Sequence, residues 1–290
     1  MTIANPFSQT GIWLKANLHT HTTLSDGDRP PLARVEQYAA AGYQVLAITD
    51  HRVVAAVEPL ERPGLTLLRS LEAHPICLDG PVYHLVCLNV SPAFRYDESR
   101  RPNDLIAQVR ADGGEVLVAH PYWCGHGLEH ILALENVIGM EVYNATCAGI
   151  GKADSTMFWD YMLAAGRFLP AVAVDDAHGP RDAFKGWTMI RAASAAVADV
   201  MAALRAGSYY ASCGPEFVDV RLADGVLDVR CSAVSEIRFV CRGACGSCQW
   251  STPGAGLTEG RFKVPASAGY VRVQIVDSQG RSAWTNPWLV

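Results

Sequence analysis

The sequence predicts an α/β barrel followed by a small antiparallel β-sandwich. Up to about residue 212, strand-like apolar runs alternate with helical patterns, and these runs are almost continuously apolar. Such runs are typical of parallel strands that are covered on both faces. After Gly214-Pro215 only short alternating runs remain, separated by Gly, Asp and Ser turns. We therefore expect a barrel in residues 1–214 and a small all-β, immunoglobulin-like sandwich in residues 215–290.

The barrel region contains apolar runs that predict strands and helical patterns between them. The expected strands are residues 14–19, 45–49, 66–71, 83–90, 115–119, 139–143 and 171–174. The expected helices begin at Pro31, Pro102, Ser155 and Ser194, and each stops at a glycine. Proline fits the first helical turn because its missing N–H would be unpaired there, and glycine favours a helix end. A turn at Asp79-Gly80-Pro81 predicts a hairpin inserted in this pattern.

The last part of the chain predicts strands without helices. The expected strands are residues 217–222, 226–231, 237–241, 261–264 and 270–276. A stretch of about 75 residues is a size at which a small core is just adequate. The spacing of Cys241, Cys245 and Cys248 resembles half of a zinc knuckle. Because four ligands normally close a structural zinc site, we favour ordinary packing for these cysteines.

The composition excludes several classes of protein. Half of the 290 residues are hydrophobic and 18% are charged, so a large core is available and disorder is not indicated. A net charge of −5 and the absence of a Lys/Arg run argue against a nucleic-acid-binding stripe or a polybasic membrane patch. The first residues lack the pattern of a signal sequence, and no apolar run approaches a membrane span. We expect a cytoplasmic protein whose nine cysteines are mostly buried thiols.

Side chains that can bind metal stand at the ends of the expected barrel strands. The nine are His19, His21, Asp26, His51, Glu72, His84, His120, Asp176 and His178. A strand alternates faces with period two, so His19 and His21 point the same way, as do Asp176 and His178. The C-terminal rim of an α/β barrel is where loops converge on a site. Imidazole and carboxylate together suit Zn, Mn, Fe or Ni rather than Ca or Mg alone, so the sequence predicts a transition-metal site.

Several segments resemble those of a known superfamily. NLHTHTTLSDG, ITDH, AHP and VDDAHG resemble the motifs of the PHP (polymerase and histidinol phosphatase) superfamily, over residues 13–212. HPYW, MEVYN, KGWT, GSYYASCGPE and RSAWTNPW are similar to the carbaryl-hydrolase-like (CehA/McbA) branch, which carries a small β domain after its barrel. The resemblance implies a distorted (β/α)7-type PHP barrel that holds two to three divalent transition-metal ions, either Zn, Mn or Fe.

The resemblance also implies how the ligands divide. His19, His21 and Asp176 would hold the first metal, and Glu72 would bridge it to a second. His84 and His120 would complete the second site. Asp26, His51 and His178 would hold a third metal, which makes the centre trinuclear. Of these residues, Glu72, Asp176 and His178 are the ones expected to carry catalysis.

The expected activity is hydrolysis of phosphoester bonds by a metal-bridging hydroxide. With three divalent ions, three carboxylates and this hydroxide, the cluster has a net charge of about +2, which favours an anionic substrate. Candidates are a small phosphorylated metabolite, a cyclic phosphodiester or a short oligonucleotide, the last being the only expected role for nucleic acid. Two alternatives remain open: hydrolysis of carbamate or carboxylic esters at the same site, and a metal-loaded binding module without turnover. The oligomeric state is not specified.

Residues outside the ligand set have weaker signals. Tyr122 and Trp123 follow a ligand motif and could stack on an aromatic group of the substrate, or pack within the loop. Arg181 and Lys185 could contact a phosphate, although a solvated loop charge is the better interpretation. His74 lies two residues beyond Glu72 and could face the same rim, but the family pattern gives it no role. The other acidic neighbours of the ligands, Asp50 and Asp175, are interpreted as supporting or structural.

Overall fold

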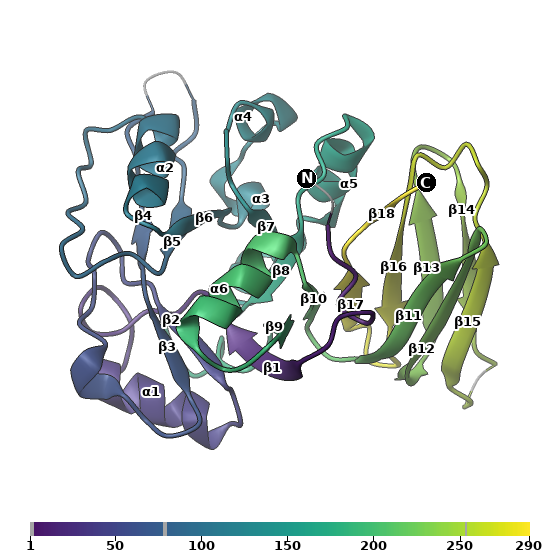
Figure 1. The fold of residues 1–290 in the computed structure, drawn as a ribbon, viewed down its shortest axis with the longest axis horizontal. Helices are drawn as coiled ribbons and strands as arrows, with labels where there is room; N and C mark the ends of the chain where they lie inside the picture. Colours follow the sequence, from purple (N-terminus) through teal and green to yellow (C-terminus); the bar gives the residue numbers. More distant parts are fainter. Residues whose placement is uncertain (1–2, 78–79, 253) are drawn as a thin grey trace.

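The structure is a computed structural model that describes residues 3–77, 80–252 and 254–290. Strands and helices of the first two hundred residues form one body, and the C-terminal strands stack beside it (Figure 1). The four expected helices are α1 (Pro31–Ala40), α2 (Pro102–Ala111), α5 (Thr156–Ala164) and α6 (Val197–Ala206). In the part of the chain that the structure describes, four short helices add to them, namely η1 (Glu58–Leu60), α3 (Pro121–Cys124), α4 (Leu128–Leu132) and η2 (Thr146–Ile150). Among the described residues, no helix has the length and hydrophobicity of a membrane span.

The strands of the first body lie in two mixed sheets rather than in one parallel sheet. One sheet contains β1 (Ile12–Asn17), β2 (Val45–Ile48), β3 (Thr66–Arg69), β9 (Trp187–Ala192) and β10 (Tyr209–Ser212). The other contains β4 (Leu71–Ala73), β5 (Leu85–Leu88), β6 (Glu115–Val118), β7 (Gly139–Asn144) and β8 (Ala171–Val174). Strands β1 to β3 are parallel, as are β6 to β8. Strands β9 and β10, which the sequence analysis did not identify, are antiparallel additions to the first sheet.

The expected strand over residues 66–71 is divided between the two sheets. The chain leaves β3 after Arg69 and enters β4 at Leu71, and β4 then pairs with β5 in antiparallel fashion. This pairing confirms the expected hairpin, whose turn at Asp79 lies outside the described residues. Two isolated bridges, Thr20 to Ala177 and His51 to Glu72, connect the two sheets. The ends of β1, β2 and β8 therefore meet β4 in one place.

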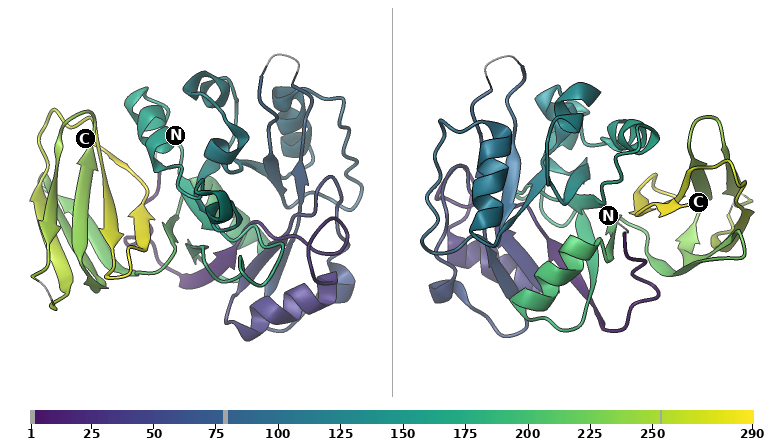
Figure 2. Two further views of the ribbon diagram at one scale, coloured as in Figure 1. Left: turned by 180° about the vertical axis from the view of Figure 1, so that it is seen from behind. Right: turned by 45° about the horizontal axis from the view of Figure 1, so that its top comes forward.

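The C-terminal strands form two layers. Strands β11 (Phe217–Ala223), β12 (Val226–Val234) and β15 (Leu257–Lys263) make a three-stranded sheet. Opposite it lie β13 (Glu236–Cys241), β14 (Gly246–Trp250), β16 (Tyr270–Val276), β17 (Ser282–Thr285) and β18 (Trp288–Leu289). Apolar side chains such as Val220, Leu227 and Phe239 fill the core that both layers share. Figure 2 shows these layers from two further directions.

The second layer is not a separate sheet. Strand β17 pairs with β10, so one ten-stranded sheet runs from the first body into the C-terminal strands. The buried side chain of Asn286 adds to this junction: it donates to the carbonyls of Gly207 and Tyr209, both at 3.0 Å, and accepts from the Ala171 N–H at 2.8 Å. The buried Arg272 also forms a two-pronged ion pair with Asp160 of α5. Strands on both sides of the domain boundary expected after residue 214 therefore belong to one continuous sheet.

We expect Asn286→Ala to lower the free energy of unfolding by about 3 kcal/mol, because it removes three buried hydrogen bonds to backbone groups, each of which contributes about 1 kcal/mol. Unfolding in urea, followed by circular dichroism and tryptophan fluorescence, measures this change, and the two signals should report a single transition. Asp228→Ala, which removes an exposed ion pair with Arg261 within the C-terminal sheet, is the control and should leave the midpoint unchanged. A wild-type midpoint in the Asn286 variant would show that the junction contributes little to stability.

Candidate metal centre

The nine side chains expected to bind metal come together where the two sheets meet. Six follow the end of a strand, namely His19 and His21 after β1, His51 after β2, His120 after β6, and Asp176 and His178 after β8. Glu72 lies within β4, and Asp26 lies on the loop between β1 and α1. Asp26 is exposed, whereas the other eight are buried or partly buried. The site is thus an interior cluster with one solvent-facing carboxylate.

The β4–β5 hairpin explains how His84 reaches the same place. Strand β5 runs antiparallel to β6, so the start of β5 lies beside the end of β6. The N–H of Ala119 donates to the carbonyl of His84 at 3.1 Å, which fixes His84 next to His120. An all-parallel arrangement would have placed the start of this strand at the opposite rim.

The first set of donor atoms surrounds Asp176. Its Oδ1 lies 2.9 Å from His21 Nε2 and 3.2 Å from His19 Nε2. The two ring nitrogens are 3.1 Å apart. Glu72 Oε2 lies 3.5 Å from each of them. Four donor atoms from three segments of the chain therefore face one point.

The second set surrounds the other oxygen of Glu72. Its Oε1 lies 2.8 Å from His84 Nδ1 and 3.1 Å from His120 Nε2. Because Oε2 faces the first set, the carboxylate of Glu72 connects the two sets with one oxygen in each.

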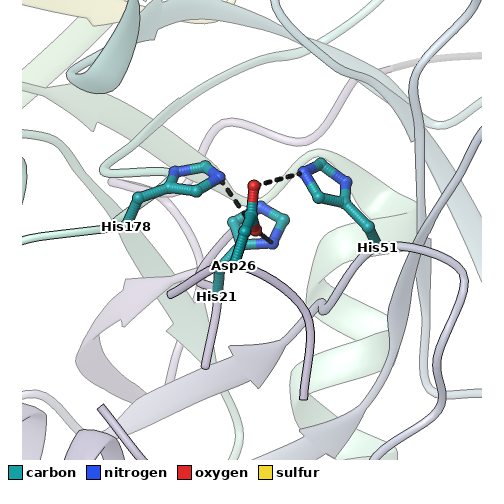
Figure 3. Close-up of side chains that lie close together, drawn as sticks. All are labelled: His21, Asp26, His51 and His178. Carbon is teal, nitrogen blue, oxygen red and sulfur yellow. Dashed lines mark ion pairs between the residues drawn. The ribbon is translucent and has the colours of Figure 1, made fainter. Parts of the chain in front are cut away.

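The third set surrounds Asp26 (Figure 3). Its Oδ1 lies 3.4 Å from His178 Nε2, and its Oδ2 lies 3.5 Å from His51 Nε2. His21 Nδ1 is 3.7 Å from Oδ1. His21 therefore borders both the first and the third set, whereas the family resemblance gave it to the first alone.

The arrangement of these donor atoms suits bound cations better than it suits hydrogen bonds between the side chains. Glu72 Oε2 and Asp176 Oδ1 are buried and accept no hydrogen bond from any residue that the structure describes. Ring nitrogens lie close to both oxygens, so the contacts lack the direction that a hydrogen bond requires. A buried ionised oxygen without a partner is costly, and a divalent ion removes that cost. Imidazole nitrogens with carboxylate oxygens are ligands that Zn, Mn and Fe accept.

The backbone is strained at two of these residues. His120 has φ of 20° and Asp176 has φ of 53°, a region that residues other than glycine rarely adopt. Such a conformation costs about 1–3 kcal/mol and persists only where the surroundings hold it. The N–H of His120 donates to Glu141 at 2.8 Å, and the side chain of Asn144 donates to Asp176 Oδ2 at 3.1 Å. Both contacts aim the strained residue at the cluster.

The carboxylates control the charge of the histidines. Burial lowers the pKa of His19, but Asp176, Glu72 and Glu141 raise it more, so this pKa lies well above its ordinary value. The pKa of His120 is also raised well above its ordinary value, since contacts with Cys124 and Glu72 outweigh burial. Conversely, burial would raise the pKa of Glu72, but His19 and His120 hold it well below its usual range. Without metal, the raised pKa values of His19 and His120 therefore favour protons on these two rings, whereas burial lowers the pKa of His21 and His84.

Glu141 is a site residue that the sequence analysis missed. It is buried within β7, and its Oε1 lies 2.7 Å from His19 Nδ1, on the side of the ring that faces away from the first set. Its other oxygen accepts from the His120 N–H and from Asn144. A carboxylate on the outer nitrogen orients a metal-binding imidazole and increases its basicity. The sequence did contain one signal of this role. Glu141 is the single charged residue in the apolar strand GMEVYN, and charged residues are almost never fully buried without a partner.

Two further residues lie beside the expected ligands, namely Cys124, which the sequence analysis did not consider, and His74, to which it gave no role. Cys124 Sγ lies 3.5 Å from His120 Nδ1, again on the outer side of a ring. His74 Nε2 lies 3.0 Å from His51 Nδ1, and its ring stacks on His84 with 3.8 Å between centroids. Both residues fall in groups of side chains whose donor atoms lie within reach of one ion.

A cavity of about 240 Å³ opens onto the cluster. Its walls include seven of the nine expected ligands, together with Trp123, Thr146 and Cys147. The Trp123 ring lies 5.1 Å from that of His120 and 5.4 Å from that of His84. Trp123 is thus an aromatic wall of the cavity.

The other residues expected to bind substrate lie elsewhere. Tyr122 faces Phe158, with 5.8 Å between ring centroids, and Lys152. Arg181 and Lys185 are exposed, and neither is among the described residues that line the cavity. Their contact with a substrate stays a prediction.

Asp50 and Asp175 hold loops in place. The carboxylate of Asp50 accepts from the backbone N–H groups and hydroxyls of Thr22 and Ser25. That of Asp175 accepts from the N–H groups of residues 184–186. Both therefore support loops that carry expected metal ligands.

The cysteines of the C-terminal layers do not form a metal site among the described residues. Cys248 pairs with Arg238, three positions before Cys241 on the same strand, so Cys248 and Cys241 lie on opposite faces of the sheet.

Comparison with known proteins supports the fold. No family model matches the chain. It is 35% identical over 89 residues to the 5'-3' exoribonuclease Rnm of Escherichia coli (strain K12), a match over 29% of this chain and only 30% of that protein. A two-domain protein containing a predicted PHP-like metal-dependent phosphoesterase, from Bacteroides vulgatus, superposes with a TM-score of 0.58 at 16% identity, over 100% of this chain and 98% of that chain. The lesion-specific endonuclease PfuEndoQ of Pyrococcus furiosus is more distant, with a TM-score of 0.47 at 11% identity, over 86% and 69% of the two chains.

The Bacteroides protein and this chain share a fold over their whole lengths. The chain therefore shares a mixed α/β fold with that two-domain protein, and it carries clusters of His, Glu and Asp side chains that could hold metal.

We expect metal binding to release protons and to strengthen as pH rises. The pKa values of His19 and His120 are raised, so both rings hold protons near neutral pH, and a metal must displace these protons before it binds. Calorimetric titration of the metal-free protein with Zn²⁺, in buffers of different ionisation enthalpy, measures the protons released. Affinity that does not change between about pH 6 and 8 would contradict this account of the site.

We expect Glu141→Gln to weaken metal binding by about 10–100-fold while the fold is retained, because an amide orients His19 without increasing its basicity. Competition with a chromogenic chelator measures the affinity. The matched control is Glu115→Gln, which changes another buried glutamate. Glu115 lies at the start of β6, at the end of the strand far from His120, and forms ion pairs with Arg110 and Arg205. Equal metal affinity in the two variants would show that Glu141 has no special connection to the cluster.

Proposed function

We propose that this protein is a metal-dependent hydrolase of phosphate esters. The observation that carries the proposal is the position of Glu72, whose oxygens face two separate sets of imidazoles beside an open cavity. A carboxylate in that position can be shared by two divalent ions. Ions bound there would supply a nucleophile at neutral pH and would stabilise the attacking and leaving oxygens of a phosphate.

The side chains of the cluster have distinct roles in this proposal. His19, His21 and Asp176 would hold one ion, and His84 and His120 would hold the other. Asp26, His51 and His178 would hold a third ion at the mouth of the cavity, where Asp26 is exposed.

The cavity indicates a small substrate, or the end of a larger one. Its volume of about 240 Å³ lies below the usual range of about 300–1,000 Å³ for ligand pockets. Trp123 offers an aromatic face to a leaving group at its wall. The fold shared with a protein that contains a predicted phosphoesterase, and the local match to an exoribonuclease, support the same class of reaction. We therefore infer an anionic phosphate monoester, a phosphodiester or a terminal nucleotide as substrate.

A panel of esters tests the proposal. Protein loaded with Mn²⁺, Fe²⁺ or Zn²⁺ is assayed with phenyl phosphate, a bis-aryl phosphodiester, a short oligonucleotide and a naphthyl carbamate. We expect a phosphoester to be hydrolysed with the highest kcat/KM, and inorganic phosphate to inhibit competitively. Faster hydrolysis of the carbamate without inhibition by phosphate would favour a carbamate or carboxylic ester hydrolase. No turnover of any ester by metal-replete protein would favour a binding module.

We expect Glu72→Gln to reduce kcat by more than about a hundredfold, because the substitution removes the charge that two ions would share. The bound metal is measured in the same preparation, so that loss of ions and loss of turnover are separated. Glu115→Gln serves again as the control and should retain its activity. Turnover near the wild-type level in Glu72→Gln would place the reaction elsewhere.

A further inference from the structure

Two histidines of the cluster, His178 and His19, present one ring nitrogen to a set of donor atoms and the other to a neighbouring oxygen. His178 turns Nε2 toward Asp26, and its Nδ1 lies 2.8 Å from the carbonyl oxygen of Asp176. His19 turns Nε2 to the first set, and Glu141 lies at its Nδ1. The outer partner matters because a neutral imidazole carries one proton, and the nitrogen that holds it cannot bind metal.

His51 has two neighbours at its outer nitrogen. Its Nε2 faces Asp26, and its Nδ1 lies 3.0 Å from His74 Nε2 and 2.6 Å from Glu72 Oε2. The contact with His74 has the geometry of a hydrogen bond. Glu72 Oε2, although closer, accepts no hydrogen bond from the described residues, so it does not lie in the direction of a proton on Nδ1. The partner of His51 is therefore His74.

His74 is held in the orientation that this contact needs. Its backbone N–H donates to the hydroxyl of Tyr96 at 3.0 Å. Its ring lies flat on that of His84, with an interplanar angle of 15°, and only 13% of its side chain is exposed. Nε2 of His74 is thus fixed beside His51 before any ion binds.

We propose that His74 is a positioning residue that accepts the Nδ1 proton of His51 and so directs the His51 Nε2 lone pair toward Asp26 and His178. The inference rests on the proposed metal-binding role of these residues. The proposed hydrogen bond has a second consequence, because a proton that His51 donates to His74 is not donated to Glu72. Oε2 of Glu72 is then free to bind an ion of the first set. One contact would serve two sets of ligands.

A competing possibility is that His74 binds metal directly. His51, Glu72 and His74 offer donor atoms within reach of a single ion. The two roles differ in what can replace the imidazole. An amide oxygen accepts a proton from His51 as a ring nitrogen does, but it is a poor substitute as a ligand of a transition metal.

Three variants separate these roles. His74→Gln keeps an acceptor, His74→Phe keeps an aromatic ring against His84 without an acceptor, and His130→Phe changes a histidine outside the cluster. Each protein is stripped with a chelator, reloaded with Zn²⁺, and analysed for bound zinc by elemental analysis and for affinity by calorimetry. Thermal unfolding of each metal-free variant confirms that it is folded.

We expect His74→Phe to weaken one zinc ion by about 10–100-fold while the remaining ions stay bound. His74→Gln should restore most of that affinity, and His130→Phe should behave like the wild type. If His74→Gln loses as much zinc as His74→Phe, His74 is a ligand and the positioning role is wrong. Wild-type affinity in His74→Phe would also overturn it. If the wild-type protein itself binds no zinc after reloading, the proposed function fails instead, so the two failures are distinguishable.

Discussion

The site depends on one buried carboxylate, that of Glu72. It is fully buried, and its two oxygens face imidazoles from four segments of the chain, which are those of His19 and His21, of His51, of His84 and of His120. An ionised group in a protein interior is unfavourable unless opposite charge lies close by. Protons on His19 and His120, whose pKa values are raised, supply that charge when the site lacks metal, and divalent ions would supply it in the loaded protein. This explains why histidines predominate around Glu72: an imidazole can carry a proton in the metal-free protein and can bind an ion in the loaded protein.

The fold meets this constraint by bringing strand ends from two sheets to one place. The bridges from Thr20 to Ala177 and from His51 to Glu72 join the sheets there. The antiparallel β4–β5 hairpin brings Glu72 of β4 and His84, which directly precedes β5, to the same place, which parallel strands of a regular barrel would not do. The strained backbone of Asp176 completes the arrangement. Burial of the apolar core formed by the strands that lead to the cluster offsets the free-energy cost of this strain.

The sequence predicted the parts of this site that depend on local pattern. His19 and His21 could be recognised because their spacing follows the period of a strand, and the hairpin was indicated by its turn residues. Glu141 could not be recognised as readily, because its role depends on β7 lying between β6 and β8. The contact between His74 and His51 likewise arises only when β4 meets the end of β2. The continuous sheet through β10 and β17 joins residues more than seventy positions apart, a pairing that no local pattern specifies.

The central claim is that the three sets of donor atoms hold metal ions and that Glu72 connects two of them. Anomalous X-ray scattering from crystals of protein loaded with Mn²⁺ or Zn²⁺ tests it most directly. The account predicts separate peaks at the first and second sets, each about 2.0–2.2 Å from a different oxygen of Glu72. A further peak is predicted beside Asp26. Metal-soaked crystals with no peak within coordination distance of Glu72 would contradict the account.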